Sequence, residues 1–177
     1  WIIVAGGFLG TFIGGGLQSF TFSIFLEPMS SDLGWSRTAL TGALTLQLIV
    51  ASALAPLFGR MIDKSGPRLI MLVLSFVGGA VAITLSQVKE IWQFYLVFAL
   101  AGMSGGAGLG SVVTGAAVSK WFVRLRGRAL AFTTMGSAAP GAILAPIVTV
   151  IVFNHGWRLG WLTMAMLFWV ILLPFSL

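Results

Sequence analysis

The sequence contains no cysteine, a single histidine and few charged residues. Without cysteine the chain forms no disulfide and offers no thiolate to a metal, and His155 alone does not make a metal site. Only 8% of the 177 residues are charged and 58% are hydrophobic, whereas soluble domains carry about a quarter charged residues. These scarcities exclude a soluble domain and a disulfide scaffold, and we expect neither a metal nor a cofactor.

The charged residues that are present fall between long apolar runs. Each run is near or above the ~20 residues that cross a bilayer as a helix. The six runs are roughly Trp1–Leu26, Thr38–Gly59, Leu69–Val88, Ile91–Ser119, Ala129–Asn154 and Leu159–Leu177. In lipid such runs must satisfy their own backbone hydrogen bonds, as helices do. The sequence therefore predicts an all-α, multi-pass integral membrane protein with six transmembrane helices.

The net charge of +6 gathers at segment ends rather than on one face, which is typical of membrane topology and not of a nucleic-acid partner. One set of connections holds Arg60, Lys64, Arg68, Lys120, Arg124, Arg126 and Arg128. The opposite connections hold Arg37, Lys89 and Arg158, beside Glu27, Asp32 and Glu90. Cytoplasmic loops carry an excess of Lys and Arg. We therefore expect the first set, and the N-terminus with it, to be cytoplasmic.

Weak internal similarity relates the two halves of the chain at an offset of about ninety residues. Gly14-Gly15-Gly16 has a counterpart in Gly105-Gly106 and Gly108, and Gly66-Pro67-Arg68 precedes the third run as Gly156-Trp157-Arg158 precedes the sixth. Three helices would cross in one direction and the next three would start from the other side. This arrangement is the one expected for an inverted 3+3 repeat. The alternative is that the match arose by chance among glycine-rich helices.

The connection after the second run carries one acid among several bases. Its marked residues are Gly59, Arg60, Asp63, Lys64, Gly66, Pro67 and Arg68. The two glycines permit tight turning, and Pro67 suits the first turn of a following helix. The acid can exchange basic partners or cap the next helix, where the dipole favours a negative charge. The plain alternative is a positively charged loop with one neutralising aspartate.

The motif Gly59-x-x-x-Asp63-Lys64-x-Gly66-Pro67-Arg68 resembles the signature loop between the second and third helices of the major facilitator superfamily. It departs from the commonest form at Pro67, where a basic residue is often found. The resemblance covers residues 1–177 and implies the N-terminal half of a twelve-helix secondary active transporter, not an enzyme. The C-terminal six-helix half would then lie outside this chain. The resemblance also implies gating roles for Gly59, Arg60, Asp63, Lys64, Gly66 and Arg68.

Two further stretches are similar to the bacterial monocarboxylate-porter and oxalate–formate antiporter branch of that family. They are Gly34-Trp35-Ser36-Arg37, and Trp121-Phe122 followed by the basic cluster, Ala129-Leu130-Ala131 and Gly136–Gly141. This similarity implies a small organic anion such as a monocarboxylate as substrate, and the inner membrane of a bacterium. The alternatives are transport of another solute or drug, a non-transporting receptor or assembly unit, and dimerisation of two six-helix units.

Polar residues within the predicted spans are few, and those in lipid should face the bundle interior or a wet cavity. Helices one and four line the cavity in the family, which makes Gln18, Phe22 and Thr114 the cavity candidates. The alternative for Gln18, and the favoured interpretation for Gln47, is an interhelical hydrogen bond of about 1 kcal/mol. No ionisable residue lies inside a predicted span. An organic anion would therefore find its compensating cation in the second half.

The fifth run contains Gly136, Pro140 and Gly141. Small residues let helices approach closely, and a proline removes one backbone hydrogen bond and bends a helix. A bend at this place could flex during alternating access. A static kink that neighbouring helices relieve is the alternative.

Overall fold

The computed structural model describes residues 8–9, 11–12, 22–65, 67–104 and 126–176. The elements within these ranges are all helices: α2 (Phe22–Leu33), α3 (Arg37–Ser65), α4 (Pro67–Ser86), α5 (Ile91–Ser104), α7 (Arg126–His155) and α8 (Trp157–Ser176). The prediction of an all-α fold is confirmed for this part of the chain.

One predicted boundary is wrong. Residues 59–65 do not form a loop, because α3 continues through them to Ser65. No proline or glycine interrupts the chain from Arg60 to Ser65, so the helix extends beyond its apolar part and carries the basic side chains with it. Pro67 begins α4 as predicted, because the first helical position needs no backbone N–H donor. Helix α3 thus ends at Ser65 and α4 begins at Pro67.

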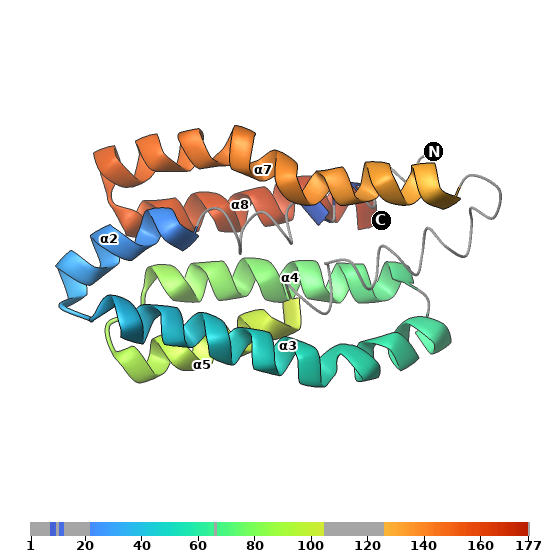
Figure 1. Ribbon diagram of the computed structural model, residues 1–177, viewed down its shortest axis with the longest axis horizontal. Helices are drawn as coiled ribbons and strands as arrows, with labels where there is room; N and C mark the ends of the chain where they lie inside the picture. Colours follow the sequence, from blue (N-terminus) through green and yellow to red (C-terminus); the bar gives the residue numbers. More distant parts are fainter. Residues whose placement is uncertain (1–7, 10, 13–21, 66, 105–125, 177) are drawn as a thin grey trace.

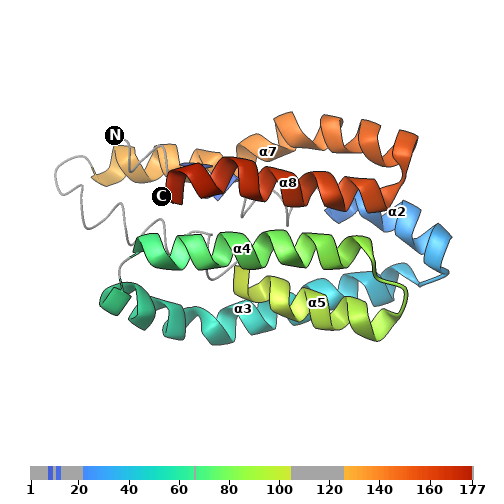
Figure 2. The same cartoon turned by 180° about the vertical axis from the view of Figure 1, so that it is seen from behind.

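The helices lie side by side as a bundle (Figures 1 and 2). The most extensive packing joins α4 to α8 and α3 to α5, and α4 also contacts α5 while α7 contacts α8. Helix α2 touches α3, α7 and α8. The bundle thus consists of one group, α3, α4 and α5, and a second group, α2, α7 and α8, which meet along the α4–α8 contact.

Glycines permit the closest contacts between these helices. A Cβ atom added at Gly78 would lie 2.8 Å from Cε1 of Phe168, and the Trp169 indole occupies the space beside Gly79. A Cβ atom at Gly102 would lie 2.7 Å from the backbone oxygen of Gln47. Small residues at such crossings let helix backbones approach, which matters in lipid because packing replaces the hydrophobic effect as the driving force.

Aromatic rings form much of the core between α2, α5 and α8. Phe94 lies 4.4 Å from Phe98 between ring centroids, and Phe25 stacks on Trp161 at 4.3 Å. Both Phe25 and Phe94 are fully buried. This core links the two groups of helices at the level of α2.

The outside of the bundle is strongly apolar. Arg37–Met61 and Gly127–His155 are long and apolar enough to cross a membrane, and only 22% and 28% of their most apolar windows are buried. Exposed large side chains include Leu48, Ile49, Phe132, Met135 and Phe153. So many exposed large apolar side chains are typical of contact with lipid or protein and not with water.

The two ends of the bundle are distinct in Figure 1. The α2–α3, α4–α5 and α7–α8 connections lie at one end, and the α3–α4 junction and the start of α7 lie at the other. Exposed Arg60, Lys64 and Arg128 belong to the second end. The prediction that the two basic stretches share one end is therefore confirmed for their described parts.

Candidate functional site

The predicted gating motif lies at the end of α3 and the start of α4. Arg60 and Lys64 are exposed and one helical turn apart, so they share one face of the last turns of α3. Asp63 also belongs to the last turn of α3, three residues before Gly66. Whether its carboxylate caps α4, as the sequence had allowed, stays a prediction. Gly66 and the side chains of Asp63 and Arg68 lie outside the described part, and their gating roles stay predictions.

Of the predicted cavity residues, Gln18 and Thr114 lie outside the described ranges. Phe22, the first residue of α2, is 5% exposed, and its ring meets Phe98 of α5 edge-on at 5.4 Å. This contact places the start of α2 beside α5. The role of Phe22 in a substrate cavity stays a prediction.

The predicted bend lies in α7, which continues through Pro140 and Pro146 and changes direction near its middle (Figures 1 and 2). Pro140 has no N–H to donate to the carbonyl of Gly136. Gly136 is buried, and a Cβ atom there would collide with Thr11 Oγ1 and the carbonyl of Phe8. Gly141 is half-buried. Whether this region flexes during transport stays a prediction.

A buried polar contact secures the same part of α7. The Thr11 hydroxyl donates to the carbonyl of Thr133 at 2.6 Å, and the Thr133 hydroxyl donates to the carbonyl of Ala129 at 2.8 Å. Thr11 and Thr133 are 4% and 2% exposed. Buried hydroxyls need such partners. The contact is possible because Gly136 lets the N-terminal segment come close to α7.

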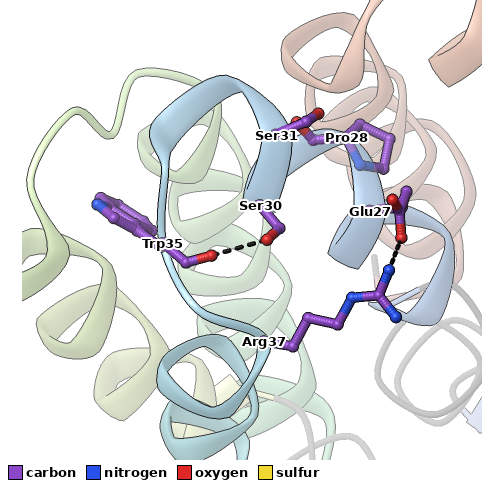
Figure 3. A network of polar contacts seen from close by, with 6 residues as sticks. All are labelled: Glu27, Pro28, Ser30, Ser31, Trp35 and Arg37. Carbon is purple, nitrogen blue, oxygen red and sulfur yellow. Dashed lines mark hydrogen bonds and ion pairs between the residues drawn. The ribbon is translucent and has the colours of Figure 1, made fainter.

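Sequence reasoning missed a cluster at the opposite end of the bundle. We call it the charged collar, and it consists of Glu27, Asp32, Arg37, Trp157 and Arg158. Figure 3 shows its α2–α3 corner, where the Arg37 guanidinium pairs with the Glu27 carboxylate and the Ser30 hydroxyl donates to the Trp35 carbonyl at 2.7 Å. These contacts fold α3 back on α2 around Gly34, whose φ is 68°.

The rest of the collar joins α2 to α8. Asp32 Oδ2 accepts a hydrogen bond from Trp157 Nε1 at 2.9 Å and another from the Arg158 guanidinium at 3.2 Å. That guanidinium lies 4.4 Å from the centroid of the Trp157 ring. In the sequence, Trp157 reads as an interfacial aromatic and Arg158 as a loop cation. Only the sharp turn at Gly156 and the packing of α8 bring them to Asp32.

A separate hollow of about 340 Å³ lies beside the α4–α5 connection. Its lining residues are Thr84, Gln87, Val88, Trp92, Gln93, Leu96 and Val97. The side-chain oxygen of Gln93 accepts the backbone N–H groups of Lys89 and Glu90, both at 3.3 Å, and so caps α5. Phe22 does not line this hollow.

Comparison with known proteins places the chain among transporters. The sequence profile of the Major Facilitator Superfamily matches residues 7–177. The oxalate:formate antiporter of Oxalobacter formigenes is 26% identical over 141 residues, which cover 77% of this chain and 32% of that protein. The MFS-type transporter pytF of Aspergillus terreus is 30% identical over 179 residues, covering 94% and 58%. The riboflavin transporter RibJ of Trypanosoma brucei brucei is 29% identical over 166 residues, covering 89% and 29%.

The chain thus spans 29% to 58% of the length of these three relatives. The family match extends over nearly the whole sequence and includes every helix that the structure describes. Members of this family are integral membrane transporters and not enzymes, in keeping with the exposed apolar helices. The chain belongs to the Major Facilitator Superfamily.

Proposed function

We propose that this chain is the N-terminal six-helix half of a secondary active transporter that moves a small organic anion by alternating access. The observation that carries the proposal is the Asp63-containing basic motif at the α3–α4 junction, in a chain of this family. Substrate would bind near the membrane midplane, between this bundle and a second one, and the two would tilt to expose it to each side in turn.

The pairing of helices supports an inverted 3+3 repeat. If α2, α3 and α4 are matched with α5, α7 and α8, the α3–α5 contact corresponds to the contact between α7 and α2. Likewise the α4–α5 contact corresponds to α8–α2, and α4–α8 corresponds to itself. One position of the sequence separates the described end of α3 from the start of α4, and one, Gly156, separates α7 from α8. We infer that six transmembrane helices are arranged in this way.

The charge difference between the ends supports the orientation. Arg60, Lys64 and Arg128 are exposed at the end that holds Asp63, and an excess of basic residues marks the cytoplasmic side of membrane proteins. We therefore place this end, and the N-terminus, in the cytoplasm of a bacterium whose inner membrane holds the protein. The basic motif would then close the cytoplasmic side by contact with the second half.

The substrate class rests on resemblance and on charge. One relative is an oxalate:formate antiporter, which favours a mono- or dicarboxylate. Two riboflavin transporters, RibJ and MCH5 of Saccharomyces cerevisiae, are also similar, at 29% and 30% identity. They make riboflavin the second candidate. The predicted spans contain no cation of their own, so an anion requires a basic residue in the second half.

Exchange assays with the complete transporter in proteoliposomes test this proposal. Vesicles loaded with unlabelled oxalate, formate or lactate should take up the labelled form of the same anion, while protein-free vesicles should not. A parallel assay with labelled riboflavin tests the second candidate. Uptake of riboflavin alone would replace the anion proposal. Failure to move any of these solutes, with folded protein in the vesicles, would favour a non-transporting role.

A further inference from the structure

Asp32 occupies a position that its own helix disfavours. It lies in the last turn of α2 (Phe22–Leu33), where the negative end of the helix dipole opposes a carboxylate. Arg158 is the second residue of α8 (Trp157–Ser176), where the positive end of that dipole opposes a cation. The two side chains face each other across 126 positions of sequence. Each unfavourable placement is therefore offset by the tertiary contact and not by its own helix.

The Trp157 indole makes the contact more than a surface ion pair. Asp32 and Arg158 have side chains 48% and 49% exposed, and pairs of that kind contribute little. Trp157 is 4% exposed, and its N–H donates to the same Asp32 oxygen at 2.9 Å. Without Asp32, this buried donor would lose the partner that the structure gives it, which costs more than losing a solvated ion pair.

A second contact between the same two helices lies further along them. The Phe25 ring stacks on Trp161 at 4.3 Å, and Gly160 leaves room for it, since a Cβ atom there would be 2.7 Å from Phe25 Cε1. Met29, which is 1% exposed, is buried on α2 between Phe25 and Asp32 in sequence. The polar contact of Asp32 with Trp157 and the aromatic contact of Phe25 with Trp161 thus join the same two helices at successive positions.

We propose that Asp32 is a positioning residue, which binds the end of α2 to the start of α8 so that these helices move as one unit during transport. The inference rests on the proposed function and on the prediction that Phe22, the first residue of α2, lines the substrate cavity. Asp32 acts through Trp157 and Arg158 and does not touch the substrate. Its loss lets the end of α2 separate from α8 and changes the geometry of the cavity.

Cysteine labelling tests the contact independently of transport. The chain contains no cysteine, so Met29→Cys introduces a single buried thiol beside the contact. In the complete transporter, with any cysteine of the second half replaced by serine, N-ethylmaleimide should label this thiol slowly. Asp32→Ala, which removes the acceptor of both hydrogen bonds, should raise the labelling rate about tenfold, and Trp157→Phe, which removes the N–H donor together with part of the buried ring, about threefold. Glu27→Ala, which removes the other ion pair of α2, is the matched control and should change the rate less than about twofold.

Transport kinetics then separate positioning from mere stability. Asp32→Ala should raise the KM for oxalate exchange at least about threefold and change turnover less than about twofold, while Asp32→Glu should restore much of the wild-type KM. Labelling of Asp32→Ala at the wild-type rate would overturn the inference, as would equal effects of Asp32→Ala and Glu27→Ala. If oxalate is not transported but labelling responds as stated, the contact stands and the proposed substrate fails.

Discussion

The two ends of this bundle use charge differently. The end with the charged collar carries balanced charges, three acidic and three basic: Glu27, Asp32, Glu90, Arg37, Lys89 and Arg158. The opposite end carries one acid and five bases in its described ranges: Asp63, Arg60, Lys64, Arg68, Arg126 and Arg128. We call this second set the basic end. Four of the six charged residues at the collar end, the four of the collar itself, are joined in ion pairs within the bundle.

Asp32 and Asp63 sharpen this comparison, because each lies in the last turn of a helix. A carboxylate is disfavoured at that position unless a cation compensates it. The cation that compensates Asp32 is Arg158 of α8, within this half. Asp63 lies among bases that we expect to exchange contacts with the second half. The difference agrees with the proposal that one end holds its helices together while the other forms and releases contacts with the second half.

The largest expected effect comes from removing the acid of the basic end, which tests whether the two ends differ in their role in transport. Asp63→Asn should lower the exchange rate of the complete transporter about tenfold or more, since each ~1.4 kcal/mol added to the rate-limiting barrier is a factor of ten. Its unfolding temperature in detergent should stay unchanged. Asp32→Ala, which removes the acceptor of the buried Trp157 N–H, should instead lower the unfolding temperature. Glu90→Gln, an acid at the other end, is the control for transport. Exchange by Asp63→Asn at the wild-type rate would contradict the gating role.

The next effect concerns packing. Gly160→Ala should destabilise the protein by about 1–3 kcal/mol, the usual cost of overpacking, because the added Cβ atom would lie 2.7 Å from both Phe25 and Val152. Gly59→Ala at the basic end is the matched variant, with nothing within 4 Å of its Cβ position. It should stabilise α3 by up to about 1 kcal/mol through helix propensity. Equal unfolding temperatures for the two variants would disprove the difference in packing.

A smaller effect comes from backbone conformation at the collar. Gly156 joins α7 to α8 with a φ of 87°, a region that costs a residue with a Cβ atom about 1–2 kcal/mol. Gly156→Ala should therefore lower stability by that amount, although nothing lies within 4 Å of the new Cβ atom. Gly127→Ala, in the first turn of α7 and equally open, should not. Thermal unfolding of both variants checks the prediction.

The smallest effect belongs to the exposed ion pair of the collar. Glu27 and Arg37 have side chains 71% and 69% exposed, and pairs this open contribute less than about 1 kcal/mol, decreasing with salt. A double-mutant cycle with Glu27→Gln and Arg37→Gln should give a coupling in that range. A coupling that is larger and independent of ionic strength would show that this corner of the collar is stronger than its exposure indicates.

Much of the fold follows from local properties of the chain. The uncharged runs predict the helices, and Pro67 and Gly156 mark two of their junctions. The motif around Asp63 indicates the family that the comparison then shows. The predicted loop at residues 59–65 is wrong because an end of apolar character is not an end of helix. Charged residues such as Arg60 and Lys64 can continue a helix beyond its apolar part.

By itself, the sequence determined that this protein consists of apolar helices with basic residues gathered at one end, because helix length and polarity are properties of contiguous residues. The tertiary structure alone decided which helices meet. It decided that Asp32 finds Trp157 and Arg158, and that Gly78 and Gly79 receive Phe168 and Trp169. Such contacts join residues about 90 or more positions apart. They depend on how two helix surfaces fit, a property that no local pattern of residues carries.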